Sequence, residues 1–304
     1  MTDWTSRDIP DMSGRVALIT GANSGLGLAA AQALARANAT VLLACRSESN
    51  AGRAQAELAA ANPGARVQVA TLDVASLQSV RNFAEAVQRR FAAIDLLINN
   101  AGIMATPHAR TPDGFEMQFA TNHLGHFALT GLLLPLLGMR PGGRVVAVSS
   151  IAARSGRIDF EDLMGERRYD PWKAYNQSKL ANLMFALELQ RRLGRAGSTV
   201  TAVAAHPGAS TTNLFSTPGG FLAKRVMSPL LSKFMFQPAA QGALPILFAA
   251  TAPAAMPGGY YGPRGFQEVK GPPGPAAVPR QALDAAVAAR LWRVSEQLTG
   301  VAYP

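Results

Sequence analysis

The feature that most constrains the fold is a glycine-containing turn between a short apolar run and an alanine-rich stretch. Residues 16–20 are apolar and partly β-branched, which predicts a buried strand. Gly21, Gly25 and Gly27 follow, and residues 28–37 have the Ala and Leu content of a helix. Glycines let a backbone approach a pyrophosphate closely, and N–H groups at a helix N-terminus bind anions. The stretch therefore predicts a phosphate-binding turn, although an ordinary strand-to-helix turn also contains glycines.

Apolar runs and helical patterns alternate along the rest of the chain. Further strands are expected at residues 40–44, 67–72, 95–98, 144–149 and 199–204, with a short last strand near Tyr260 and Tyr261. Helices are expected at residues 28–37, 49–61, 76–91, 115–137, 174–193 and 281–298. The alternation predicts an α/β fold, in which a doubly wound, mostly parallel sheet carries helices on both faces. The 304 residues, 48% of them hydrophobic, can bury the core of a single domain.

Composition restricts the compartment and the partners. Residues 1–14 are polar and unlike a signal peptide, and no apolar run is long enough to span a bilayer. A single cysteine, Cys45, excludes an internal disulfide and suits a reducing cytoplasm. The net charge of +10 permits nucleic-acid binding, but the arginines occur as scattered pairs without interleaved aromatics. We therefore expect a cytoplasmic protein, with a homo-oligomer as one possible state. We expect its positive charge to attract an anionic cofactor rather than nucleic acid.

The end of the second expected strand bears on cofactor choice. Ligands of such sheets bind beyond the carboxyl ends of the strands, where an acidic residue commonly holds the ribose hydroxyls of NAD. This chain has Cys45 at that place and Arg46 next to it. A guanidinium matches a phosphate in charge and in geometry. Arg46 thus favours NADP over NAD, with an ordinary surface arginine as the alternative.

Small and polar residues also follow the third and fourth expected strands. Asp73 and Val74 follow the third strand, and Asn99, Asn100, Ala101 and Gly102 follow the fourth. The Asp73 carboxylate could accept a hydrogen bond from an adenine amino group. Small side chains and amides allow a ribose to approach closely, whereas Asn99 is expected to be structural.

Tyr175 and Lys179 form the candidate catalytic pair. Their i, i+4 spacing places both side chains on one face of a helix. A phenol has a pKa near 10 and is a poor base at neutral pH, but a nearby ammonium favours the phenolate. The pair suits an alcohol–carbonyl interconversion. Ser149 and Ser150 end the fifth expected strand, where a hydroxyl could hold the substrate oxygen, and Asn122 could anchor a water that reaches the lysine.

These motifs, in this order, resemble the short-chain dehydrogenase/reductase family. The matched pieces are residues 20–27, Asp73, residues 99–102, Asn122, Ser150, Tyr175 with Lys179, and residues 206–208. The stretches Ala-Cys-Arg-Ser, Asn-His-Leu-Gly-His-Phe and Gln-Ser-Lys-Leu-Ala-Asn are similar to the retinol-dehydrogenase-like branch, near the protochlorophyllide reductases. The similarity runs through residues 14–214 and continues more loosely to the end. It implies a Rossmann-type domain that binds a nicotinamide dinucleotide.

The resemblance also implies roles for the matched residues. The catalytic residues would be Asn122, Ser150, Tyr175 and Lys179. Tyr175 would be the acid/base, and Lys179 would lower its pKa and hold the nicotinamide ribose. The cofactor would contact Gly21, Asn23, Ser24, Gly25, Leu26, Gly27, Arg46, Asp73, Val74, Asn100, Ala101, Gly102, Tyr175, Lys179 and Thr212. Ser24 stands where many members carry a basic residue, so the NADP preference rests mainly on Arg46.

Two segments are expected to wall the substrate pocket. Residues 154–172 form a polar loop, and residues 213–237 are rich in Leu, Met and Phe. The second segment favours an apolar substrate, although a helix pair packed on the core explains the same residues. Residues 257–279 are crowded with Gly and Pro and cannot form a regular helix, and they precede the C-terminal helix in the last part of the domain, residues 257–304.

The histidines raise the question of a metal. His123 and His126 are three residues apart on an expected helix and could share a zinc ion, but no Cys or carboxylate accompanies them at suitable spacing. Core or helix-capping roles are favoured for both, and a turn role for His206, so no metal is expected. The sequence thus predicts an NADP-dependent oxidoreductase that moves a hydride between the nicotinamide and an apolar alcohol, aldehyde or ketone. The alternative is a dinucleotide-binding sensor or scaffold without turnover, against which the four intact catalytic residues argue.

Overall fold

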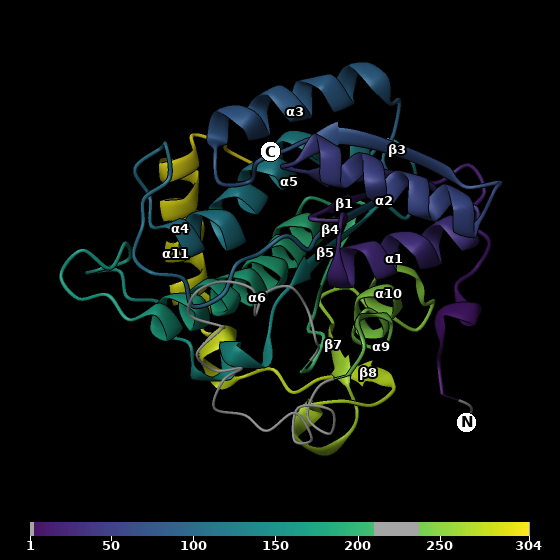
Figure 1. Cartoon of the computed structure of the whole chain (residues 1–304). Helices are drawn as coiled ribbons and strands as arrows, with labels where there is room; N and C mark the ends of the chain where they lie inside the picture. The colour runs from purple at the N-terminus through teal and green to yellow at the C-terminus, as the bar shows by residue number, and fades with distance from the viewer. Residues whose placement is uncertain (1–2, 210–236, 304) are drawn as a thin grey trace.

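An eight-stranded sheet organises the chain in the computed structural model, which describes residues 3–209 and 237–303 (Figure 1). The strand order is β3-β2-β1-β4-β5-β6-β7-β8. The strands are β1 (Val16–Thr20), β2 (Thr40–Cys45), β3 (Arg66–Thr71), β4 (Leu96–Asn99), β5 (Arg144–Val148), β6 (Thr201–Ala205), β7 (Tyr260–Pro263) and β8 (Pro273–Pro275). All neighbouring strands are parallel except β7 and β8. The predicted doubly wound, mostly parallel sheet is confirmed.

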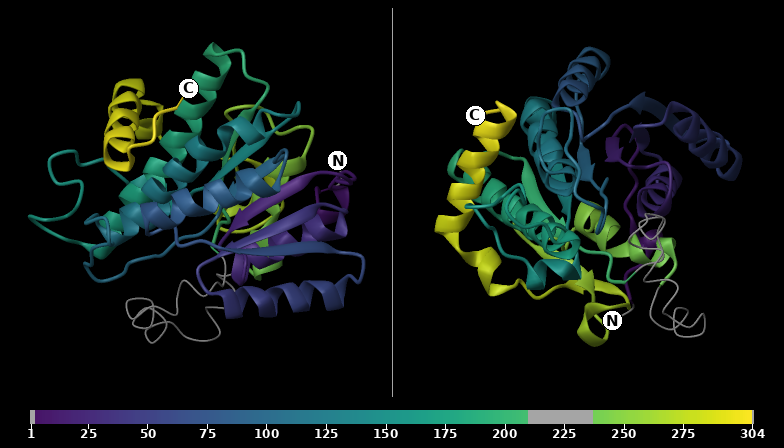
Figure 2. Two further views of the ribbon diagram at one scale, coloured as in Figure 1. Left: turned by 90° about the horizontal axis from the view of Figure 1, so that it is seen from above. Right: turned by 60° about the vertical axis from the view of Figure 1, so that its left-hand side comes forward.

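Helices cover both faces of this sheet, as the two rotated views make clear (Figure 2). The α-helices are α1 (Gly25–Arg36), α2 (Glu48–Ala61), α3 (Leu77–Arg90), α4 (Met117–Phe119), α5 (Gly125–Leu137), α6 (Pro171–Arg195), α9 (Ala239–Gly242), α10 (Leu244–Thr251) and α11 (Ala285–Thr299). The core on one face is formed with α1, α2 and α10, and the core on the other with α3, α5, α6 and α11. Within the described residues, no helix combines the length and the apolar character needed to cross a membrane.

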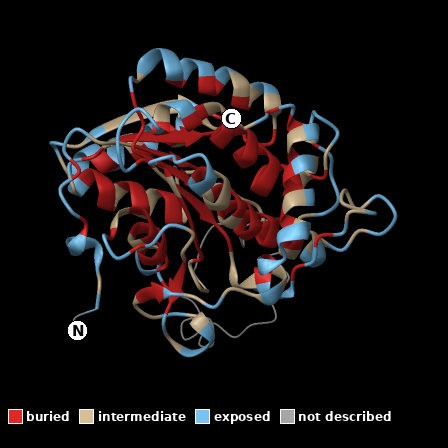
Figure 3. Ribbon diagram, turned by 180° about the vertical axis from the view of Figure 1, so that it is seen from behind, coloured by how far each residue is buried: buried red, intermediate tan, exposed pale blue. Residues whose placement is uncertain are grey.

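The alternation of side chains in β1 explains why both faces are covered. Leu18 belongs to one core, whereas Ala17 and Ile19 belong to the other, and all three are fully buried. Successive side chains of a strand point to opposite faces, so an uninterrupted apolar strand needs a partner layer on each side. Buried residues accordingly fill the sheet and the inner faces of the helices (Figure 3).

The helix expected at residues 115–137 has an irregular first half. It comprises α4, a π-helical turn at Ala120–Leu124 and then α5. Gly125 lies so close to the end of β3 that a Cβ there would be 2.0 Å from the Val74 carbonyl oxygen. Such π turns are frequent at functional sites, and this one contains Asn122.

The C-terminal third differs most from the sequence expectations. Helices α9 and α10 and the antiparallel strand β8 were not expected, and β8 lies within the Gly- and Pro-rich segment. The last helix begins at Ala285 rather than at residue 281, because Arg280–Leu283 forms a 3-10 turn and Asp284 caps the helix. The segment expected to cover the substrate, residues 213–237, lies outside the described residues except for Gln237.

Candidate active site

A cavity of about 620 Å³ is lined by residues at the carboxyl ends of β1 to β6. Most of the residues expected to bind the cofactor line it: Gly21, Asn23, Ser24, Gly25, Leu26, Gly27, Arg46, Asp73, Val74, Asn100, Ala101, Gly102, Tyr175 and Lys179. Thr212 lies outside the described residues. The lining also includes Pro207 and Gly208, which belong to the matched residues 206–208, and Trp172, which ends the loop expected to form a wall. Ile103, Met104 and Ala209 also line the cavity and were not singled out from the sequence, although each lies within two residues of a matched segment.

The glycine turn forms one end of the cavity. Gly21 and Gly25 have left-handed backbones, with φ of +64° and +56°. A Cβ on Gly27 would lie 2.5 Å from the Gly21 carbonyl oxygen and 2.6 Å from Asn100 Nδ2. Ser24 begins α1 without a side-chain capping hydrogen bond, so its hydroxyl does not occupy the first N–H groups of the helix. The turn therefore offers a backbone cradle that fits the pyrophosphate of a dinucleotide.

Thr20 connects this turn to the end of β4. Its hydroxyl oxygen accepts hydrogen bonds from the backbone N–H groups of Asn100 and Ala101, both at 2.9 Å. The Asn100 side chain donates to the Thr20 carbonyl oxygen at 2.8 Å. Asn99 is buried and donates to the Thr130 hydroxyl at 2.8 Å, in agreement with its expected structural role.

The β2 end carries no carboxylate. Cys45 is the last residue of β2 and is buried, and burial raises the pKa of its thiol although backbone N–H groups of Ala22 and Asn23 lower it. Arg46 follows, is exposed and lines the cavity. The charged side chain that lines the cavity at this strand end is thus a cation.

Tyr175, Ser150 and Lys179 lie together at another part of the lining. Lys179 Nζ donates to the Val148 carbonyl oxygen at 3.2 Å and lies 5.9 Å from the centroid of the Tyr175 ring. Ser150 begins a 3-10 turn, η3 (Ile151–Ser155), and its hydroxyl accepts from Ala152 N at 3.2 Å. Ser149 also lines the cavity, but its hydroxyl donates to the Lys179 carbonyl oxygen at 2.7 Å. The Ser150 hydroxyl is therefore the one placed to contact Tyr175.

Burial dominates the protonation of this group. Burial raises the pKa of the Tyr175 phenol, and the hydrogen bond with Ser150 lowers it in part. Burial also lowers the pKa of Lys179 to about 8. The sequence predicted that the Lys179 ammonium would lower the Tyr175 pKa, whereas in the structure the cost of burial dominates and the pKa is raised.

Asn122 stands behind the lining. Its Oδ1 accepts from Ile103 N at 2.8 Å, and its Nδ2 donates to the Ile103 carbonyl oxygen at 3.0 Å and to Ser178 Oγ at 2.8 Å. A Cβ on Gly102 would lie 3.0 Å from Asn122 Oδ1 and 3.4 Å from Lys179 Nζ. Gly102 thus lets the amide and the ammonium approach the same point of the backbone.

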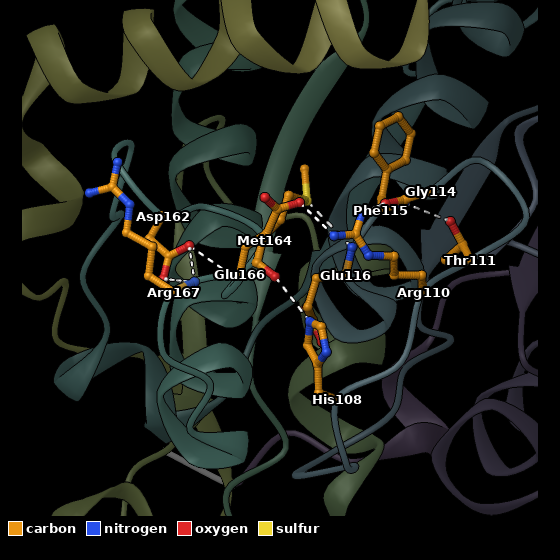
Figure 4. Close-up of polar contacts among 10 residues, drawn as sticks. All are labelled: His108, Arg110, Thr111, Gly114, Phe115, Glu116, Asp162, Met164, Glu166 and Arg167. Atoms are coloured by element: carbon orange, nitrogen blue, oxygen red, sulfur yellow. Dashed lines mark hydrogen bonds and ion pairs between the residues drawn. The ribbon is translucent and has the colours of Figure 1, made fainter.

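Two loops from different parts of the chain meet at an ion pair. Arg110 forms an ion pair with Glu166 at 2.7 Å, and the two side chains point toward one another in Figure 4. Asp162 holds its own loop by accepting from the backbone N–H groups of Glu166 and Arg167. This loop, expected from the sequence to form a wall, leads directly to Trp172 in the lining.

The histidines serve the packing of the fold. His123 contacts the Ser295 hydroxyl and His126 the Thr20 hydroxyl, both at 2.9 Å. His206 Nδ1 accepts from Gly208 N at 3.2 Å, which is the turn role expected for it. Across the described ranges, no group of three His, Cys, Asp or Glu residues is arranged to hold a metal ion.

Comparison with known proteins agrees with this geometry. The sequence model of the family described as short chain dehydrogenase matches residues 15–218. The chain is 40% identical to retinol dehydrogenase 14 of Mus musculus, over 95% of this chain and 87% of that one. It is 38% identical to polyprenol dehydrogenase of Mus musculus, over 98% and 88%. A crystal structure of a putative uncharacterized protein from Mycobacterium paratuberculosis has 46% identity and a TM-score of 0.82, with 100% of both chains covered. The chain therefore belongs to the short-chain dehydrogenase family and has a dehydrogenase or reductase role.

Proposed function

We propose that this protein is an NADP-dependent oxidoreductase that transfers a hydride between the nicotinamide and an apolar alcohol, aldehyde or ketone. The observation that carries the proposal is one continuous cavity. It joins the glycine turn and Arg46 to Ser150, Tyr175 and Lys179. When bound, the nicotinamide supplies or accepts the hydride.

The preference for NADP rests on the β2 end. Arg46 is exposed to the cavity, and Cys45 replaces the carboxylate that would repel a 2′-phosphate. Gly21 to Gly27 would hold the pyrophosphate through backbone N–H groups, because no Cβ fills the space at Gly27. Asp73 and Asn100 would face the adenosine and ribose parts.

The proton chemistry falls to Tyr175. In the reduction direction the phenol donates its proton to the substrate oxygen, and the raised pKa of Tyr175 keeps that proton in place until an oxyanion develops. The Ser150 hydroxyl, which is hydrogen-bonded to Tyr175, would hold the same oxygen. The Lys179 ammonium lies 5.9 Å from the centre of the Tyr175 ring, and its charge would offset part of the cost that burial imposes on the remaining phenolate.

An apolar substrate suits the lining near Tyr175. Met104 and Ala105 pack with Tyr175 in a small hydrophobic cluster, and Trp172 stands beside it with an edge-on ring contact at 6.3 Å. Relatives named retinol dehydrogenase and polyprenol dehydrogenase support an apolar alcohol or its carbonyl product as the substrate class.

A panel of aldehydes and ketones of graded hydrophobicity tests the proposal, with consumption of NADPH followed by absorbance. We expect kcat/KM to rise with the apolar surface of the carbonyl compound and Tyr175→Phe to remove turnover. A protein that binds NADPH tightly but reduces no member of the panel, and oxidises none of the matching alcohols, would be a dinucleotide-binding sensor or scaffold.

A further inference from the structure

Glu268 is a carboxylate outside the cavity that accepts hydrogen bonds from His206 and Ala277 and forms an ion pair with Arg154. It lies in the loop between β7 and β8. Its Oε2 contacts Arg154 at 2.7 Å and His206 Nε2 at 2.8 Å, and its Oε1 accepts from Ala277 N at 2.9 Å. Because His206 Nδ1 accepts from Gly208 N, the proton of the neutral ring lies on Nε2 and points at the carboxylate. All three partners present N–H groups to Glu268, so both of its side-chain oxygens must act as acceptors. A carboxylate has two acceptor oxygens, whereas an amide has one.

The partners of Glu268 belong to two separate parts of the cavity lining. Arg154 lies on η3, whose first residues, Ile151 and Ala152, line the cavity directly after Ser150. His206 immediately precedes residues 207–209, which also line it. A backbone contact adds to this link, because Ala209 N donates to the Val269 carbonyl oxygen at 2.8 Å. The loop between β7 and β8 therefore contacts both flanks of the cavity. One flank is the segment after Ser150, residues 151–154, and the other is residues 206–209.

The backbone at Glu268 is strained. Gln267 and Glu268 have φ of 49° and 58°, a left-handed conformation that glycine adopts more easily than any side-chain-bearing residue. Such positions persist when the surroundings over-determine them, and they cluster near functional sites. Here Arg154 also donates to the Gln267 carbonyl oxygen at 3.2 Å. Position 268 therefore carries a carboxylate although its left-handed backbone would favour glycine.

The carboxylate is charged at neutral pH. Burial alone would raise the pKa of Glu268, but the hydrogen bonds from His206 and Ala277 and the charge of Arg154 lower it below its ordinary value. A neutral amide of the same shape could not replace it, because its NH2 group would face Ala277 N or the His206 and Arg154 donors.

We propose that Glu268 is a positioning residue, which fixes the flank that follows Ser150 relative to residues 207–209. It acts through Arg154 and His206 and touches neither substrate nor cofactor. Its kinetic consequence rests on the proposed oxidoreductase function, because a fixed Ser150 matters only if its hydroxyl holds a reacting oxygen.

Glu268→Gln tests the proposal by kinetics. Misplacement of a reacting group by about 1 Å can cost roughly a hundredfold in rate, so we expect kcat to fall roughly ten- to hundredfold. The dissociation constant of NADPH should stay unchanged, because the glycine turn and Arg46 are untouched. Arg154→Met removes one arm of the network at a side chain that is 35% exposed, and serves as the second variant if Glu268→Gln does not fold. The double variant should lose no more than the stronger single one.

Gln267→Gly is the matched control, because it relieves the neighbouring left-handed residue and keeps the carbonyl that Arg154 contacts. It should retain wild-type kcat. Unchanged kcat in Glu268→Gln, or additive losses in the double variant, would overturn the proposal.

A second readout needs no turnover, so it separates this proposal from the proposed function. The backbone amide resonances of Ala152 and Gly208 report on the two flanks. Both should shift in Glu268→Gln and neither in Gln267→Gly. If the wild type reduces no carbonyl compound, the oxidoreductase function fails while this measurement still decides whether Glu268 couples the flanks. A shift confined to one flank would refute the coupling.

Discussion

The buried Lys179 ammonium should lower the free energy of unfolding, and replacing Lys179 with an apolar residue should raise it. The side chain is 4% exposed, and burial lowers the pKa of its ammonium from 10.5 to about 8. Each unit of pKa corresponds to about 1.4 kcal/mol, so keeping the proton in the folded protein costs about 3 kcal/mol at neutral pH. Among the contacts of Lys179 that the structure describes, none is with a carboxylate that would offset the cost of burying the charge.

The pH dependence follows from the direction of the shift. The pKa is lower in the folded state, so between about pH 8 and pH 10.5 the unfolded chain binds more protons than the folded one. The free energy of unfolding therefore rises with pH across this window. Below about pH 8 the full cost of the buried charge is present.

Lys179→Met removes the charge and keeps the length of the side chain. It also removes the hydrogen bond to the Val148 carbonyl oxygen, a loss of about 1 kcal/mol. That oxygen still accepts from Asn182 Nδ2 at 3.1 Å, so it is not left unsatisfied. The net expectation is a gain of about 2 kcal/mol in unfolding free energy at pH 7, which disappears by about pH 10.5.

Urea denaturation of the wild type and the variant at pH 7 and pH 10, without dinucleotide, measures this difference. Lys173→Met is the control, because Lys173 lies on the same helix and is exposed, and its replacement should change stability little at either pH. A Lys179→Met variant less stable than the wild type at pH 7, or a stability difference that is equal at both pH values, would refute the reasoning.

Three further predictions concern the cavity. Tyr175→Phe should lower turnover roughly 10²- to 10⁴-fold with NADPH binding intact, measured by steady-state kinetics and fluorescence titration; near-normal turnover would exclude Tyr175 as the acid/base. Arg46→Ala should weaken NADPH roughly ten- to hundredfold and leave NADH almost unchanged, and Cys45→Asp combined with it should favour NADH; equal weakening of both cofactors at fixed salt would contradict the NADP preference. Gly27→Ala should lower the free energy of unfolding by about 1–3 kcal/mol because its Cβ meets backbone at 2.5 Å, whereas Gly52→Ala, in open space on α2, should raise it by about 1 kcal/mol; similar effects of the two on urea denaturation would disprove the cradle.

Local patterns predicted the parts of the fold that local physics determines. The strands β1 to β6 and the glycine turn lie where they were expected. In β1, β2, β4, β5 and β6 burial on both faces requires continuous apolar residues, whereas the edge strand β3 is only half-buried. The i, i+4 spacing of Tyr175 and Lys179 places both on one face of α6. The π turn around Asn122 was not foreseen, because a one-residue irregularity leaves the apolar pattern of the helix intact.

The pKa of Tyr175 could not be predicted from the sequence spacing of Tyr175 and Lys179. Sequence neighbours indicate that an ammonium lies near the phenol, and this predicts a lowered pKa for Tyr175. The structure adds that Tyr175 is 6% exposed, and the cost of burying a phenolate raises the pKa of its side chain. How deeply a side chain is buried depends on residues far away in the chain, among them Met104.

The glycines of the last third show why the remainder could not be predicted. The sequence identified residues 257–279 as an irregular segment with one short strand near Tyr260 and Tyr261. It did not indicate that Gly262 lies where a Cβ would be 2.0 Å from His206 Nε2. Gly208 likewise leaves room for the Val269 carbonyl oxygen, which a Cβ would approach to 2.3 Å. Each glycine is required by a group from another segment, about 55 to 60 residues away in sequence. These close approaches bring Glu268 within reach of His206, so the network proposed to position Ser150 depends on contacts that no local pattern contains.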